Sequence, residues 1–105
     1  MSEEEIKQQR MDLLVELDAQ KTMVTNLTER QKRERDAFRA FTDAYATPGR
    51  YAQVHGDRLR ISTIDYPLST FDVIAATERR KELDAAETRL RELMERSKAL
   101  GISLS

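Results

Sequence analysis

The sequence of 105 residues has no cysteine, no tryptophan, only three glycines, two prolines and one histidine. Without cysteine, the chain forms no disulfide and offers neither a thiolate nucleophile nor a cysteine-based metal site. Few Gly and Pro beside 39% hydrophobic and 35% charged residues are typical of long helices or a coiled coil rather than of a rounded enzyme domain. We therefore expect one mostly helical domain over residues 1–105.

The chain also lacks a charge of one sign and any long apolar run. Its 18 basic and 19 acidic residues leave a net charge of −1, whereas proteins that bind nucleic acid usually carry a basic excess. The first residues, Met1 to Glu5, are acidic where a secretory signal would be basic. We expect a cytoplasmic protein that does not bind membranes.

A long helix is predicted from residue 2 to residue 46. Ser2 and Glu5 have the spacing of a capping box. From Ile6 to Tyr45, positions at alternating intervals of four and three are apolar in eight of twelve cases, and neither Gly nor Pro interrupts the pattern before Pro48. Pro48 and Gly49 then end the helix.

Residues 50–63 change to a period of two, which predicts a β-hairpin. A type II′ turn at Gly56-Asp57 places Val54 opposite Leu59 and Ala52 opposite Ile61, so that apolar residues pair with apolar residues. The other face then carries the candidate partner-binding residues Tyr51, Gln53, His55, Arg58 and Arg60.

A second helix is predicted over residues 69–100, with Ser69 and Asp72 as a capping box and Gly101 as the stop. We expect it to fold back on the first helix and to place Leu90, Leu93 and Leu100 against Leu17, Val24 and Leu27. The predicted fold class is mostly α: an antiparallel two-helix coiled-coil hairpin whose helices are joined by a small β-hairpin.

Because the second helix is shorter, it should cover the first only down to about residue 16. The uncovered end carries an apolar stripe, and the free energy of burying it is lost if it stays exposed to water. A homodimer or larger oligomer is the simplest cover. The expected oligomer seam comprises Ile6, Met11, Leu13, Leu14 and Leu17.

No residue is nominated for catalysis, for a cofactor or for a metal. His55 is the only histidine, and no partner for acid–base work or for metal binding stands at a suitable spacing. Gly49, Gly56 and Gly101 are too far apart for a phosphate-binding loop. We expect a protein that is not an enzyme.

Two basic stretches, residues 30–35 and 79–81, should lie close together if the helices pair. Acidic residues are interleaved with both, so a solvated helical face is the first interpretation. The alternative is a regulator that binds nucleic acid, or a nucleic-acid enzyme, through basic residues of the helices and the hairpin.

Protein contact is the remaining class. We expect Phe38, Phe41, Tyr45 and Phe71 to form a core that seats the hairpin, while the outer hairpin face carries the Tyr and Arg residues that are enriched at interface hot spots. The predicted function is a non-catalytic interaction module: an adaptor, assembly factor, chaperone-like subunit or protein inhibitor. Its partners would be a second copy of itself and an unidentified protein.

The order helix, β-hairpin, returning helix resembles a prefoldin β-type subunit, a chaperone that holds unfolded clients. The resemblance spans the chain as an order of elements and includes no shared sequence motif. It implies assembly through the hairpins and client binding by the helix tips.

Overall fold

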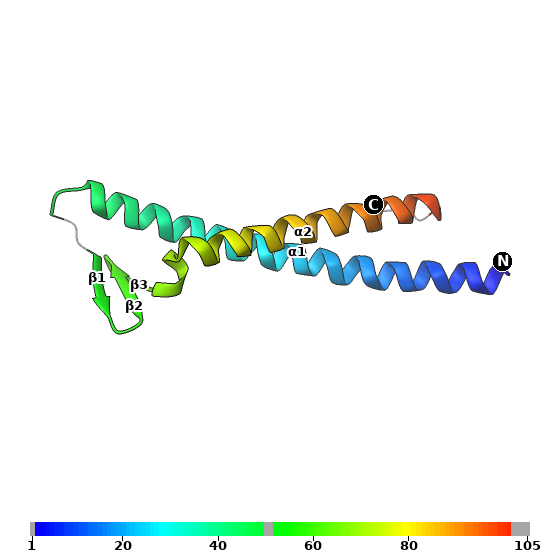
Figure 1. Cartoon of the computed structure of the whole chain (residues 1–105). Helices are drawn as coiled ribbons and strands as arrows, with labels where there is room; N and C mark the ends of the chain where they lie inside the picture. The colour runs from blue at the N-terminus through cyan, green and yellow to red at the C-terminus, as the bar shows by residue number, and fades with distance from the viewer. Residues whose placement is uncertain (1, 50–51, 102–105) are drawn as a thin grey trace. The chain divides into compact units, whose positions relative to one another are not determined.

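The structure is a computed structural model that describes residues 2–49 and 52–101. Its elements follow in the order α1 (Glu3–Ala46), β1 (Ala52–His55), β2 (Arg58–Ile61), β3 (Ile64–Pro67), the 3-10 helix η1 (Leu68–Phe71) and α2 (Val73–Ala99). Figure 1 shows the strands and η1 between the two helices along the chain. The predicted fold class is confirmed: two long helices are joined by a small antiparallel sheet.

Local capping determines where α1 begins. Ser2 Oγ accepts a hydrogen bond from the Glu5 amide at 3.2 Å, so one of the unpaired amides of the first turn is satisfied as predicted. The acidic residues of that turn also suit the positive end of the helix dipole. After Ala46 the chain turns at Gly49, whose φ of 85° is a conformation that glycine adopts without strain.

The predicted hairpin register is confirmed, and a third strand extends it. Ala52 pairs with Ile61 and Val54 with Leu59. Gly56 has a φ of 61° while Asp57 is not among the residues with positive φ, as a type II′ turn requires. Beyond the predicted hairpin, β3 pairs antiparallel with β2, so β2 is the central strand of three.

The second helix begins later than predicted. Residues 68–71 form η1, and the Leu68 amide donates to the Asp57 carbonyl at 2.8 Å, which holds this segment against the first turn of the sheet. The cap is Asp72 rather than Ser69, because Asp72 Oδ1 accepts from the Ala75 amide at 3.1 Å. The prediction of a helix from residue 69 was therefore wrong by one turn.

The chain divides into two compact units, residues 1–28 with 82–105 and residues 29–81. We call them the terminal unit and the sheet unit. In the terminal unit, Leu13 and Leu17 of α1 bury themselves against Leu93 of α2. Leu90, Met94 and Leu100 pack around this cluster. Gln20 Nε2 also donates to the Ala86 carbonyl at 2.9 Å, so a polar residue of the seam is satisfied across the pair.

The predicted pairing of the helices was out of register in this unit. Leu93 clusters with Leu13 and Leu17, and not with Val24 or Leu27. The end of α2 reaches farther along α1 than expected, since Arg10 Nε donates to the Leu100 carbonyl at 3.1 Å. The uncovered part of α1 is correspondingly shorter.

This shift changes the candidate oligomer seam. Leu13 and Leu17 are buried within the chain, so they are not available to a partner as predicted. Ile6 is half-buried. Met11 and Leu14 remain exposed, although they are large and apolar. Oligomerisation itself stays a prediction.

Alanine side chains form the helical side of the core in the sheet unit. Ala37 and Ala44 of α1 are buried, and Ala44 clusters with Leu59 and Ile61 of the central strand. Small side chains at this spacing let a sheet approach a helix closely. Val54, predicted to face inward, is exposed beside the Gly56 turn.

Phe71 of η1 is the centre of the aromatic cluster. Its ring lies 5.6 Å from Phe38, 5.8 Å from Phe41 and 5.9 Å from Tyr66, measured between centroids. Phe71 is half-buried and packs against the sheet core, Phe38 is half-buried beside it, and Phe41 is 40% exposed. Tyr45 was wrongly included in the predicted core, because it is 87% exposed, and Tyr66 of β3 contacts Phe71 instead.

Candidate partner-binding surface

The outer face of the sheet carries the residues that the sequence nominated. Along β2, buried Leu59 and Ile61 alternate with exposed Arg58 and Arg60. The register sets Gln53 beside Arg60 and His55 beside Arg58, so these four side chains share one exposed face. The remaining nominated residue, Tyr51, lies outside the described residues.

Asp65 of β3 organises this face and was not among the predicted residues. Its Oδ1 accepts from Arg60 Nε at 3.2 Å, and its backbone carbonyl accepts from Arg58 Nη2 at 3.2 Å. Hydrogen bonds to Asp65 thus hold the guanidinium groups of both arginines in place. A shallow pocket of about 230 Å³ lies on this face and is lined by His55, Arg58, Arg60 and Asp65. The alternation Ile64-Asp65-Tyr66 was the signal that could have indicated the third strand.

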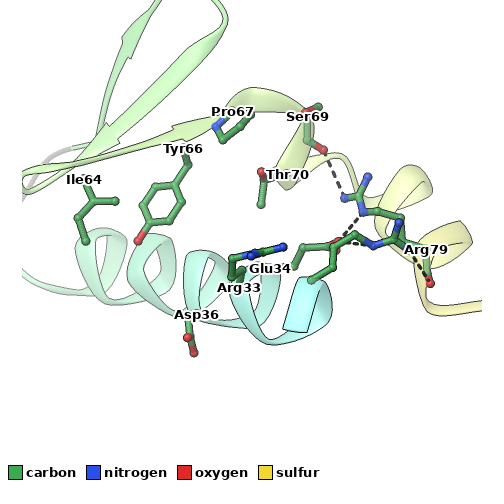
Figure 2. Close-up of a pocket in the computed structure, with 10 residues that line it drawn as sticks. Arg33, Glu34, Asp36, Ile64, Tyr66, Pro67, Ser69, Thr70 and Arg79 are labelled. Carbon is green, nitrogen blue, oxygen red and sulfur yellow. Dashed lines mark hydrogen bonds and ion pairs between the residues drawn. The ribbon is translucent and has the colours of Figure 1, made fainter. Parts of the chain in front are cut away.

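A larger cleft lies elsewhere in the sheet unit, where β3 and η1 meet α1 and the start of α2. Its volume is about 570 Å³, within the range of small-ligand and side-chain pockets. Figure 2 shows Tyr66 and Ile64 pointing from β3 toward α1. The cleft is lined by Arg30, Arg33, Glu34, Asp36, Ile64, Tyr66, Pro67, Ser69, Thr70 and Arg79.

The Glu34 carboxylate pairs with two of the arginines that line this cleft. Glu34 accepts from Arg79 Nε at 2.6 Å (Figure 2). The same carboxylate lies 3.8 Å from Arg30 Nε. The Ser69 carbonyl also faces Arg79 Nη2, at 3.5 Å. Arg79 is therefore held in place by neighbours within the unit.

Arg33 differs from its neighbours in the cleft. It is exposed, and it has no side-chain partner within the described part of the chain. The hydroxyls of Tyr66 and Thr70 belong to the same lining. An apolar wall with a cation and hydroxyl groups can hold an apolar side chain together with a carboxylate. Arg33 belongs to the basic stretch of residues 30–35, but the cleft itself was not predicted.

The two basic stretches are neighbours, as predicted. Arg30 Nη2 donates to the Arg79 carbonyl at 3.4 Å, and Arg80 Nη1 donates to Gln31 Oε1 at 2.8 Å. Because Glu34 stands among these cations, the positive field here is weaker than the run of arginines suggests.

His55 is the single histidine of the sequence. His55 Nε2 lies 3.4 Å from Gln53 Oε1, an amide that takes no proton. Over residues 2–49 and 52–101, no group of three or more His, Asp or Glu could hold a metal ion. None of the helices described is long and apolar enough to cross a bilayer.

Comparison with known proteins adds no family: the chain matches no protein-family model, no curated protein and no solved structure. The resemblance to a prefoldin β-type subunit therefore rests on the order of elements alone.

Proposed function

We propose that this chain is a non-catalytic interaction module whose sheet unit binds a segment of another protein. The cleft lined by Tyr66, Ile64 and Arg33 carries the proposal, because it joins an apolar wall to an exposed cation that has no side-chain partner among the described residues. Such a site suits a peptide segment with an apolar side chain next to an Asp or Glu. The chain would act as an adaptor, assembly factor, chaperone-like subunit or inhibitor.

The outer face of the sheet supplies a second, separate contact area in this proposal. Arg58 and Arg60 are anchored on Asp65, so little side-chain freedom is lost when a partner binds. Tyr and Arg are the residues that most often dominate binding energy at protein interfaces.

The experiment compares two arginine variants of α1 in capture from the native lysate. Arg33→Glu reverses the charge in the cleft, whereas Arg39→Glu makes the same change at an exposed position outside the cleft lining. We expect the first to reduce capture of the partner about tenfold or more and the second to leave it nearly unchanged. Equal capture by both variants would remove the cleft from the proposal.

A second pair of replacements separates the outer face from the cleft. Arg58→Ala with Arg60→Ala leaves buried Leu59 and Ile61 in place, so folding should survive. A tenfold loss of capture, about 1.4 kcal/mol, would assign binding energy to this face. Undiminished capture would restrict the site to the cleft.

The alternative function is a regulator that binds nucleic acid or a nucleic-acid enzyme. It is favoured by the exposed cations Arg58 and Arg60 and by the neighbouring stretches around Lys32 and Arg80. The capture is therefore repeated after nuclease treatment. Loss of the partner with nuclease, and a steep dependence of binding on salt, would favour this alternative.

A further inference from the structure

One face of α1 in the terminal unit carries apolar side chains that no other part of the described chain covers. Leu13 and Leu17 face Leu93 and are buried, while Met11 and Leu14 are 54% and 45% exposed. Val15 is exposed beside them. Three large apolar side chains within five residues form a patch that isolated surface residues do not explain.

Met11 and Leu14 belong to a longer stripe of exposed residues on α1, which continues in both directions at alternating intervals of three and four residues. The same spacing generates the seam of a coiled coil, because it keeps side chains on one face of a helix. We name this stripe the outer seam; it consists of Glu4, Lys7, Met11, Leu14, Asp18 and Lys21.

The four charged members of the outer seam have no ion pair within the described residues. Neither Glu4 and Lys7 nor Asp18 and Lys21 shares a side-chain hydrogen bond or salt bridge with another described residue. Glu16 of the same unit, by contrast, is paired with Arg89 at 3.5 Å. The outer seam therefore offers both apolar surface and unpaired charges to a partner.

We propose that a second copy of this chain docks on the outer seam with its α1 antiparallel. When the two helices cross between Asp12 and Leu13, Met11 of each chain meets Leu14 of the partner subunit. In an antiparallel coiled coil, positions of one kind in the heptad face positions of the other kind, and these two residues satisfy that rule. The two apolar pairs form the centre of the interface.

The charges on either side then match. In the same register Lys7 faces Asp18 of the partner subunit, and Glu4 faces Lys21 of the partner subunit. By the two-fold symmetry each pair occurs twice. Opposite charges flank the apolar centre throughout, which favours this pairing over others.

Other self-pairings lose this match. In a parallel dimer each residue faces its own copy, so Glu4 faces Glu4 and Lys7 faces Lys7. Sliding the antiparallel pair by one heptad sets Leu14 against Asp18, or Met11 against Lys7. A stripe that is complementary to itself in one register is the property of a two-fold interface, which is why the occupant is a second copy.

This inference goes beyond the proposed function, because the outer seam lies in the terminal unit and the cleft lies in the sheet unit. The two are tested by separate readouts, self-association and partner capture.

The test is a charge-reversal cycle measured by sedimentation equilibrium of the full chain. Lys7→Glu and Asp18→Lys each replace two attractions by two repulsions in the dimer. Each should weaken self-association about tenfold or more, while the double variant restores the opposite charges and should return near the wild-type affinity. Unchanged association in the single variants, or no recovery in the double variant, would overturn the antiparallel register.

A matched pair of methionine variants tests the apolar centre. Met11 and Met23 both lie on α1 and are 54% and 50% exposed, but Met23 is outside the outer seam. Met11→Lys should weaken dimerisation about tenfold, and Met23→Lys should not, with equal helix content by circular dichroism for both. A wild-type chain that stays monomeric at high micromolar concentration would disprove the proposal.

Discussion

Arg79 of α2 donates a hydrogen bond from Nε to the carboxylate of Glu34 on α1, with 2.6 Å between the two atoms. The two side chains are 23% and 15% exposed, so water screens the pair only in part. The contact ties the start of α2 to α1. Both side chains also line the candidate cleft.

Removing the arginine should destabilise the sheet unit. Arg79→Met leaves the Glu34 carboxylate largely buried without its nearest cation, and we expect the free energy of unfolding to fall by about 2 kcal/mol. Adding Glu34→Gln should recover part of the loss. Lys81→Met is the control, because it breaks an exposed pair with Glu78 and should change stability by less than about 0.5 kcal/mol. Urea unfolding measures all four chains.

Leu93 is the most buried member of the apolar cluster that it forms with Leu13 and Leu17 in the terminal unit. Leu93→Ala should lower the free energy of unfolding by about 2–5 kcal/mol, since the leucine contacts are lost and a cavity remains. Ile74→Ala, on the same helix but 79% exposed, should cost less than about 0.5 kcal/mol. Equal effects of the two replacements would contradict the packing of Leu93 against Leu13 and Leu17.

The turn between β1 and β2 depends on glycine. A Cβ atom at Gly56 would meet nothing within 4 Å, so a penalty there would come from the backbone, whose φ is 61°. Gly56→Ala should therefore destabilise the protein by about 1–2 kcal/mol. Asp57→Ala in the same turn should destabilise the protein less. The melting temperatures of the two variants and the wild type measure the difference. A Gly56→Ala protein as stable as the wild type would mean that the turn has another geometry in solution.

Helix content is the broadest test of the fold. α1 has 44 residues and α2 has 27 of the 105 in the chain, so about two thirds of the residues should contribute a helical signal. Far-ultraviolet circular dichroism should report this fraction. A value below one half would show that one of the long helices is frayed in solution.

The candidate site was predictable in part. The alternation in β2 identified Arg58 and Arg60 as exposed, and the turn glycine set their neighbours, Gln53 and His55. Asp65 escaped prediction because its strand is four residues long, ends in Pro67 and follows a turn without glycine, in which Ser62 takes a φ of 59°. The cleft could not be foreseen, since it requires side chains from four separate segments.

Where each element begins depends mostly on neighbouring residues, and the sequence by itself determined most of it. Ser2 caps α1, Gly49 and Gly101 follow the helices, and the apolar pairs around Gly56 select one hairpin register, because these effects act within a few residues. How the helices pair was decided only by the tertiary structure. Apolar spacing shows which residues share a face, but it does not show which side-chain volumes fit together. In the sheet unit, buried Ala44 packs against the sheet while its neighbour Tyr45 stays exposed. In the terminal unit, Leu93 packs against Leu13 and Leu17 because these side chains together fill a core. Matching apolar stripes along the sequence could not reveal this pairing.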